Sequence, residues 1–278
     1  MSNGVLRRVG IVGLGKMGHP IARHLRAGGF AARGWDVDAA ARARAAASGI
    51  ALAGSIKELT AASDFVIALV GFDTEVEEVL CGAGGVAAAA RPGLIVGVAS
   101  TVAPHTMKRL AARLAQTGIT LLDMPLCRGE AAAEAGKLQI MVGGDAAGFA
   151  AVKPALQCFA DAIFHLGALG AGQTGKLVNN LILWACISAN HEGLKLAERL
   201  GVAIEPLRQA LLASSAANWA LESRVEERPM PWAEKDMMIV LKEADRVRLS
   251  LPLSGALKEA VKAVKIERGW PTPQEPED

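Results

Sequence analysis

Three glycines near the N-terminus have a spacing that suits phosphate binding. Residues 13–18 (GLGKMG) follow the pattern G-x-G-x-x-G and lie between an apolar run at residues 8–12 and a helical pattern. The first glycine allows a tight turn, the second lets the backbone approach a pyrophosphate, and the third lets the helix pack on the strand. N–H groups at the helix start then face the phosphates. We therefore expect a dinucleotide site formed by Gly13, Leu14, Gly15, Lys16, Met17 and Gly18.

An acidic residue follows the second expected strand. Asp36 stands 18 residues after Gly18, where a carboxylate accepts hydrogen bonds from ribose hydroxyls and repels a 2′-phosphate. The next residue, Val37, offers no cation to such a phosphate, although Arg33 and Arg42 are near in sequence. NAD is therefore the expected cofactor, and NADP is less favoured. A structural glycine-rich turn with a helix-capping aspartate is the alternative.

A lysine and an asparagine lie one turn apart near the start of a long expected helix. The segment GAGQTGKLVNN at residues 170–180 places Lys176 and Asn180 at i and i+4, on one helix face. Burial and the positive end of the helix dipole both disfavour a lysine cation, which suits a group that exchanges a proton near neutral pH. Asn180 is spaced to orient a substrate hydroxyl or carbonyl. A solvent-facing lysine and an interhelical asparagine are the alternative.

The elements that must position these residues alternate between strand and helix up to about residue 167. Apolar runs predict strands at 8–12, up to Trp35, and at 65–70, 94–100 and 119–125, with helices between them that include 38–48 and 104–117. This alternation predicts a parallel sheet covered by helices. Beyond residue 167, helical spacing continues to about Leu200 and then over 204–213, 216–227, 233–247 and 253–268, without a strand candidate. A Pro-rich, acidic tail at about 270–278 is expected to be mobile.

Composition argues against several other classes of protein. The chain has 278 residues, of which 51% are hydrophobic, and it carries 30 basic and 28 acidic residues. The balanced charge argues against a nucleic-acid partner bound through a broad basic surface, and the apolar content argues against disorder. No apolar stretch is long enough to span a membrane, and no signal-peptide cleavage site is recognised. We therefore expect a cytoplasmic enzyme without a membrane or nucleic-acid partner.

The reactive side chains narrow the chemistry further. No cysteine pair or Cys/His cluster has the spacing of a zinc site, so no metal is expected. The sequence contains no tyrosine, so a proton donor must be another kind of side chain. Lys176 is the candidate for that task.

The motifs together resemble those of the β-hydroxyacid dehydrogenase family, which includes 3-hydroxyisobutyrate dehydrogenases and tartronate semialdehyde reductases. The resemblance runs from about residue 8 to 268. Its markers are GLGKMGHPIARHL at 13–25, STVAP at 100–104, DMPLCRGEAAAEAGKL at 123–138, GAGQTGKLVNN at 170–180, and Lys235-Asp236. It implies an α/β fold: a Rossmann-type, doubly wound domain over 1–166, then a long interdomain helix opening an all-helical domain over 167–278, with the active site between the two.

The resemblance also implies roles for individual residues. Lys176 would be the general acid–base group and Asn180 would help to hold the substrate, beside Asn179. Ser100 and Thr101 would lie near the nicotinamide, and Lys235 would close over cofactor or substrate. The remaining expected contacts are Leu69, Val70, Val37 and Thr101 with the cofactor, and Ser100, Thr101 and residues 127–129 with the substrate. An ordinary helix-start charge pair is the alternative for Lys235-Asp236.

The sequence departs from the family pattern in the expected substrate loop. Where the family usually has Ser-Gly-Gly, this chain has Cys127, Arg128 and Gly129. An arginine fork suits a carboxylate, sulfonate or phosphate, so we expect a substrate with a strong or second anionic group bound by Arg128. An arginine that faces solvent, or pairs with Glu130 or Glu134, is the alternative. Cys127 is interpreted as a serine replacement rather than a nucleophile, because no base stands beside it in sequence.

These features favour an NAD-dependent dehydrogenase or reductase for a small, anionic 3-hydroxy acid or its semialdehyde. An NAD(P)H-dependent imine reductase of the same fold is a second reading, and a non-catalytic dinucleotide-binding interaction protein is a third. The lysine at 176 argues against the third reading. The resemblance further implies a homodimer or homotetramer built through the apolar helical half.

Overall fold

The computed structural model describes residues 6–224 and 228–274. The chain divides into two compact units, Met1–Lys176 and Leu177–Asp278. The expected domain boundary between residues 166 and 167 stays a prediction. The end of the expected helix 216–227 and the end of the expected mobile tail lie outside the described residues.

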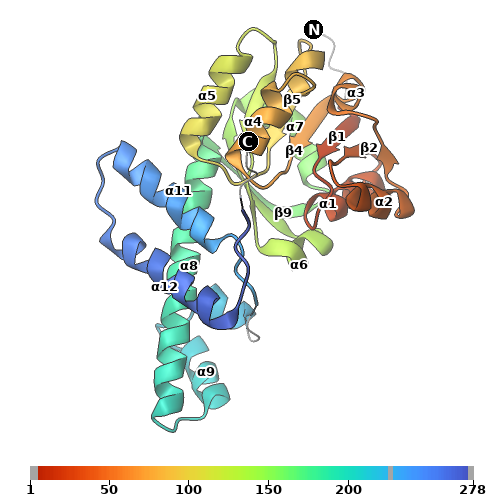
Figure 1. The fold of residues 1–278 in the computed structure, drawn as a ribbon. Helices are drawn as coiled ribbons and strands as arrows, with labels where there is room; N and C mark the ends of the chain where they lie inside the picture. Colours follow the sequence, from red (N-terminus) through yellow and green to blue (C-terminus); the bar gives the residue numbers. More distant parts are fainter. Residues whose placement is uncertain (1–5, 225–227, 275–278) are drawn as a thin grey trace. The chain divides into compact units, whose positions relative to one another are not determined.

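A single mixed sheet runs through the first unit (Figure 1). Its strands are β1 (Arg8–Val12), β2 (Ala31–Trp35), β3 (Ala51–Leu52), β4 (Phe65–Ala68), β5 (Ile95–Val98), β6 (Thr120–Asp123), β7 (Leu126–Cys127), β8 (Leu138–Gly144) and β9 (Ala160–Gly167). The order is β3-β2-β1-β4-β5-β6-β8-β7, with β9 also paired to β8. The stretch from β3 to β6 is parallel and has the 3-2-1-4-5-6 order of doubly wound dinucleotide-binding folds.

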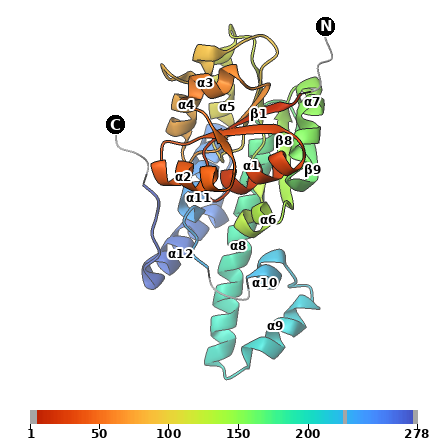
Figure 2. The ribbon, with the colours of Figure 1, turned by 90° about the vertical axis from the view of Figure 1, so that its right-hand side faces the viewer.

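Helices cover both faces of this sheet, as the edge-on view in Figure 2 shows. They are α1 (Gly18–Ala27), α2 (Ala39–Ala47), α3 (Ile56–Ala61), α4 (Asp73–Cys81), the 3₁₀ turn η1 (Val86–Ala89), α5 (Pro104–Leu114), α6 (Gly129–Glu134) and α7 (Ala146–Leu156). Neighbouring residues of β1 enter opposite cores: Ile11 lies in the cluster formed with α1, α2 and α7, whereas Val12 lies in the cluster formed with α3, α4 and α5. Both faces are therefore apolar, as parallel strands require.

The last strands of the sheet were not predicted. β8 runs antiparallel to β6 and β7, and β9 runs parallel to β8. This differs from the simple alternation of strands and helices that periodicity predicts up to residue 167. The reason is that pairing over such short strands is decided by long-range contacts, and a two-residue strand such as β7 has no periodicity to read.

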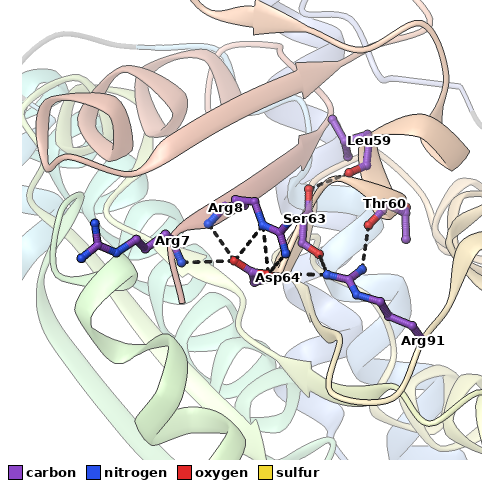
Figure 3. A network of polar contacts seen from close by, with 7 residues as sticks. All are labelled: Arg7, Arg8, Leu59, Thr60, Ser63, Asp64 and Arg91. Carbon is purple, nitrogen blue, oxygen red and sulfur yellow. Dashed lines mark hydrogen bonds and ion pairs between the residues drawn. The ribbon is translucent and has the colours of Figure 1, made fainter. Parts of the chain in front are cut away.

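A polar network fixes the beginning of β1 to the end of α3 (Figure 3). The Asp64 carboxylate accepts the backbone N–H groups of Arg7 and Arg8 and the guanidinium of Arg8, whose Nη2 lies 2.5 Å from Oδ1. Arg91 donates to the carbonyl oxygens of Ser63 and Thr60 on the same side. The hydrogen bond from Arg8 is the main reason that the pKa of Asp64 falls from 3.8 to about 2.

The second unit contains helices and no strand among its described residues. Helix α8 (Ala171–Arg199) begins in the first unit and continues into the second, where α9 (Ile204–Leu212), α10 (Trp219–Ser223), α11 (Ala233–Arg246) and α12 (Pro252–Arg268) follow. The long helix was predicted, and α9, α11 and α12 lie close to their expected ranges. Helix α10 covers residues 219–223 of the expected 216–227 segment, whose last three residues lie outside the described part of the chain. No helix in the described part of the chain is long and apolar enough to cross a membrane.

Candidate active site

The glycine loop joins β1 to α1 with the geometry that its spacing predicts. Gly13 has φ +98°, and a Cβ there would overlap the carbonyl oxygen of Leu69. A Cβ on Gly18 would overlap the carbonyl oxygen of Gly13, so the helix packs tightly on the loop. No atom lies within 4 Å of the position that a Cβ on Gly15 would take. The backbone at Gly15 therefore faces open space, which fits the approach of a pyrophosphate.

The side chains of the loop point in different directions. Leu14 is buried in the core beneath α1, and Met17 packs against the same core. Lys16 is exposed and its Nζ lies 3.2 Å from a carboxylate oxygen of Glu130 at the start of α6. The side chains of Leu14 and Met17 therefore serve packing within the first unit.

Asp36 connects the end of β2 to the glycine loop. Its Oδ2 accepts the Leu14 N–H at 2.6 Å, and its Oδ1 accepts the Asp38 N–H at 2.8 Å. The cap of α2 is Asp38, which accepts from two N–H groups of that helix. Asp36 is thus not the helix-capping aspartate considered from the sequence. Its carboxylate stands beside the glycine loop, where an adenosine ribose would have to bind.

The cations near Asp36 are already engaged. Arg42 donates to the carbonyl oxygens of Asp36 and Val37 at 2.6 and 2.9 Å. Arg33 forms an ion pair with Glu58 at 2.8 Å. Val37 is 80% exposed, so the position next to Asp36 presents an apolar side chain to solvent.

Two loops at the carboxyl edge of the parallel strands meet beside the glycine loop. Val70, after β4, donates its N–H to the Ser100 Oγ, after β5, at 2.8 Å. Ser100 is buried and Thr101 is half-buried. Carboxyl ends of adjacent parallel strands are where open α/β sheets bind their ligands. The fold therefore brings Leu69 against Gly13 and joins the next residue, Val70, to Ser100.

The first turn of α8 is anchored by a residue that the sequence reasoning did not select. The Asp123 carboxylate, fully buried at the end of β6, accepts the N–H groups of Gly170 and Gln173, each at 2.7 Å. Burial raises the pKa of this carboxyl, and the backbone N–H groups of Gly170, Gln173 and Gly172 act in the opposite direction. A polar residue closing the apolar strand TLLD was the available sequence signal.

Lys176 lies against the expected substrate loop within the first unit. Its Nζ is 3.8 Å from the Cys127 Sγ, the lysine is half-buried, and Cys127 is 3% exposed. The anchored start of α8 and strand β7 thus bring together two residues that are 49 positions apart. This contact joins the candidate acid–base group to the loop where the family pattern places substrate.

Arg128 is held by neighbours other than the two glutamates considered from the sequence. Its Nη1 lies 2.5 Å from an Asp161 carboxylate oxygen on β9 and 3.0 Å from the carbonyl oxygen of Lys137. Its backbone has φ +79°, and Gly129 follows with φ +75°. Arg128 is therefore adjacent to Cys127 in sequence, but its guanidinium is paired with the Asp161 carboxylate in this structure.

The candidate residues of the second unit form a separate cluster around Asp236. Asn180 Nδ2 donates to Asp236 Oδ2 at 2.8 Å, and Asn180 Oδ1 accepts from the Asn179 side chain at 2.9 Å. Trp184 Nε1 also donates to Asp236, at 3.1 Å. Asp236 therefore fixes the orientation of the Asn180 amide.

Lys235 stands next to this cluster at the start of α11. Its Nζ lies 5.5 Å from the centre of the Trp232 ring, a cation–π distance.

Within the ranges 6–224 and 228–274, no group of three or more His, Cys, Asp or Glu side chains could hold a metal ion.

Comparisons with known proteins match both parts of the chain. Residues 8–167 match the family model for the NAD binding domain of 6-phosphogluconate dehydrogenase. Residues 170–271 match the family model for NAD-binding of NADP-dependent 3-hydroxyisobutyrate dehydrogenase.

Full-length relatives give the same result. The chain is 34% identical over 260 residues to an L-threonate dehydrogenase of Cupriavidus necator, covering 90% of this chain and 88% of the relative. It is 35% identical to a 3-hydroxyisobutyrate dehydrogenase of Pseudomonas aeruginosa, covering 77% and 72% of the two chains. A solved structure of the Mycobacterium tuberculosis 3-hydroxyisobutyrate dehydrogenase with L-serine superposes with a TM-score of 0.86 at 27% identity, covering 96% of each chain.

Proposed function

Because the chain belongs to the β-hydroxyacid dehydrogenase family, we propose that it moves a hydride between NAD(H) and a small 3-hydroxy acid or its semialdehyde, with Lys176 as the general acid–base group. Membership makes the chain an oxidoreductase that uses NAD(P). The observation that carries the residue assignment is the 3.8 Å contact between Lys176 Nζ and Cys127 Sγ. It puts a half-buried amine beside the loop that differs from the family pattern.

In the proposed reaction, the cofactor and the residues of the chain have separate roles. A bound nicotinamide supplies the hydride chemistry, and the residues of the chain supply position and electrostatics. Lys176 takes the proton from the substrate hydroxyl during oxidation and returns it during reduction. The Asn180 amide, oriented by Asp236, helps to hold the substrate oxygen. Ser100 and Thr101, on the loop after β5, lie on the nicotinamide side of the proposed site.

NAD is the proposed preference over NADP. The Asp36 carboxylate beside the glycine loop accepts ribose hydroxyls and repels a 2′-phosphate. Arg42 and Arg33, the nearby cations, donate to backbone carbonyls and to Glu58 instead. The exposed Val37 adds no positive charge.

The second anionic group of the substrate is proposed to bind Arg128. The residue follows Cys127 directly, so its backbone lies next to the Lys176 contact. In this structure Asp161 holds the guanidinium, so a substrate anion has to replace that carboxylate. Because the substrate anion and the Asp161 carboxylate are both negatively charged, they compete for the Arg128 guanidinium.

The Lys176 assignment is tested by Lys176→Met in parallel with a substrate panel. The panel contains L-threonate, L-serine, 3-hydroxyisobutyrate and phosphorylated, sulfonated and dicarboxylic hydroxy acids, assayed by NADH formation at 340 nm. Lys176→Met should lower kcat by about 10²–10⁴-fold, the usual contribution of a general acid–base group. NADH affinity, measured by fluorescence titration, should be unchanged. Near-normal turnover by Lys176→Met would refute the role.

The Arg128 proposal is tested by Arg128→Ala and Asp161→Asn. Hydrogen bonds to charged groups contribute about 1.5–3 kcal/mol, so Arg128→Ala should raise KM for the best anionic substrate about 10- to 100-fold. Asp161→Asn should lower that KM, because it removes the competing charge. An unchanged KM in Arg128→Ala would contradict the proposal.

A homodimer or homotetramer is the proposed assembly. Large apolar side chains on the second-unit part of α8 are exposed in the single chain, namely Val178, Ile182 and Leu196, and so is Leu200 directly after the helix. Apolar surface of this kind is commonly covered by another subunit. Light scattering after size-exclusion chromatography gives the mass, and a mass of one chain would reject this assembly.

A further inference from the structure

The Gln173 side chain is completely buried on the first turn of α8. Its Oε1 accepts the Val102 N–H at 3.2 Å, and its Nε2 donates to the Ser100 carbonyl oxygen at 2.8 Å. The side-chain amide therefore binds the backbone of the residues on both sides of Thr101.

The backbone of the same residue is fixed as well. The Gln173 N–H donates to Asp123 Oδ2 at 2.7 Å, while Gly170 donates to the other carboxylate oxygen. A Cβ on Gly172 would press on Asp123 and on the Met141 carbonyl oxygen, so the helix packs directly on the end of β6 and on the middle of β8. Gln173 thus joins three pieces of the first unit: β6, the loop after β5, and α8.

These contacts lie between two parts of the proposed site. Lys176 follows Gln173 by three positions, less than one helical turn. The Ser100 carbonyl oxygen accepts a hydrogen bond from Gln173 Nε2, and the Ser100 hydroxyl accepts one from the Val70 N–H. A movement of the Gln173 amide would therefore displace the 100–102 loop relative to the lysine.

We propose that Gln173 is a positioning residue, which sets the distance between the Lys176 amine and the loop of Ser100 and Thr101 through its two side-chain hydrogen bonds. This inference rests on the proposed role of Lys176. It requires an amide in particular, because one side chain must accept from an N–H and donate to a carbonyl. A carboxylate can only accept, and a methionine of similar length does neither.

The test compares Gln173→Met and Gln173→Glu with the matched control Gln209→Met. Gln209 is an exposed glutamine on α9, and its amide binds only the neighbouring Glu205 among the contacts described. Each protein is examined by hydrogen–deuterium exchange of residues 99–103, NADH titration, thermal unfolding and steady-state kinetics. The substrate is whichever panel compound gives the highest kcat/KM, with L-threonate, L-serine and 3-hydroxyisobutyrate tried first.

Gln173→Met should expose the Val102 amide, so that its exchange becomes at least about tenfold faster because local opening becomes easier. It should also lower kcat by about 100-fold, since a displacement near 1 Å at a reacting group has effects of that size. The primary deuterium isotope effect on kcat should rise. NADH affinity should stay within about threefold of the parent value, because in the proposed site Gly13–Gly18 and Asp36 make most of the contacts with NADH. Gln173→Glu should behave likewise, and Gln209→Met should match the parent in all measurements.

Two results would overturn the proposal. The first is unchanged exchange at Val102 in folded Gln173→Met. The second is a lower melting temperature with kcat and isotope effect unchanged, which is the result expected of a purely structural residue. Lys176→Met is measured alongside: if it stays active, the proposed function fails whatever Gln173 does, whereas an inactive Lys176→Met with a normal Gln173→Met rejects this inference alone.

Discussion

Asp36 is the residue through which we propose that the chain prefers NAD over NADP. Its carboxylate accepts the Leu14 N–H of the glycine loop, and in the proposed site it would also present negative charge to the ribose. A serine there keeps an acceptor for Leu14 but removes the charge. The neighbouring Val37 is exposed, so an arginine at that position has room to reach a phosphate.

The double variant Asp36→Ser/Val37→Arg should therefore shift affinity from NADH toward NADPH. Hydrogen bonds to charged groups are worth about 1.5–3 kcal/mol, which corresponds to a change of about 10- to 100-fold in the ratio of the two dissociation constants. Fluorescence titration with each cofactor measures that ratio. Val37→Arg alone is the control for an added cation. A ratio that does not move would show that Asp36 does not determine the preference.

At the scale of elements, the C-terminal helices are tied together by a buried ion pair. The Lys265 side chain on α12 is 2% exposed, and its Nζ lies 3.0 Å from a carboxylate oxygen of Glu234 on α11. It also donates to the Pro231 carbonyl and the Thr272 hydroxyl. Burial pushes the pKa of Glu234 upward, but the hydrogen bonds from Lys265 and Thr272 outweigh it and hold that pKa below its usual value.

Lys265→Met should lower the stability of the folded protein by about 3–5 kcal/mol, because it leaves the Glu234 carboxylate without its cation. The double variant Lys265→Met/Glu234→Gln should recover part of that loss. Urea denaturation followed by circular dichroism measures both. Equal destabilisation by the single and double variants would show that the pair is not the source of the effect.

The elements also show where sequence reasoning succeeds and where it ends. Strands β1, β4 and β5 are apolar runs followed by helical periodicity, so the sequence could predict that these segments are strands and that they alternate with helices. β7 and β8 depend on antiparallel pairing with distant residues, which local periodicity does not encode. In the site, the Lys176 helix stood out by its motif. Asp123 and Gln173 lie in the same motif segments, but their roles were not predicted, because a single polar residue beside an apolar segment has the same appearance whether it is buried or exposed.

At the scale of the whole chain, the Asp64 network makes stability depend on pH (Figure 3). The pKa of the Asp64 carboxyl in the folded protein is about 2, below the usual 3.8, and the hydrogen bond from Arg8 is the largest cause. A carboxylate with a lowered folded pKa stabilises the native state above its unfolded pKa, and this contribution is lost as pH falls through the folded value. The loss therefore occurs between about pH 4 and pH 2.

Asp64→Asn should consequently melt at a lower temperature than the parent at pH 7, and the difference should shrink as the pH falls from 4 toward 2. Arg8→Met removes the donor instead of the acceptor and should show the same convergence. Thermal unfolding at pH 7, 4 and 2.5 measures this. A difference that stays constant over that range would contradict the assignment of the pH dependence to this carboxylate.

The left-handed backbone at Arg128 has a consequence for how truncation experiments on this loop are interpreted. Holding a side-chain-bearing residue at φ +79° costs about 1–2 kcal/mol relative to glycine. Arg128→Ala keeps that conformational cost and deletes the guanidinium, whereas Arg128→Gly deletes both. Effects shared by the two variants therefore report the lost charge, and effects that differ between them report backbone strain. The pair of substitutions separates substrate recognition from loop conformation at a single position.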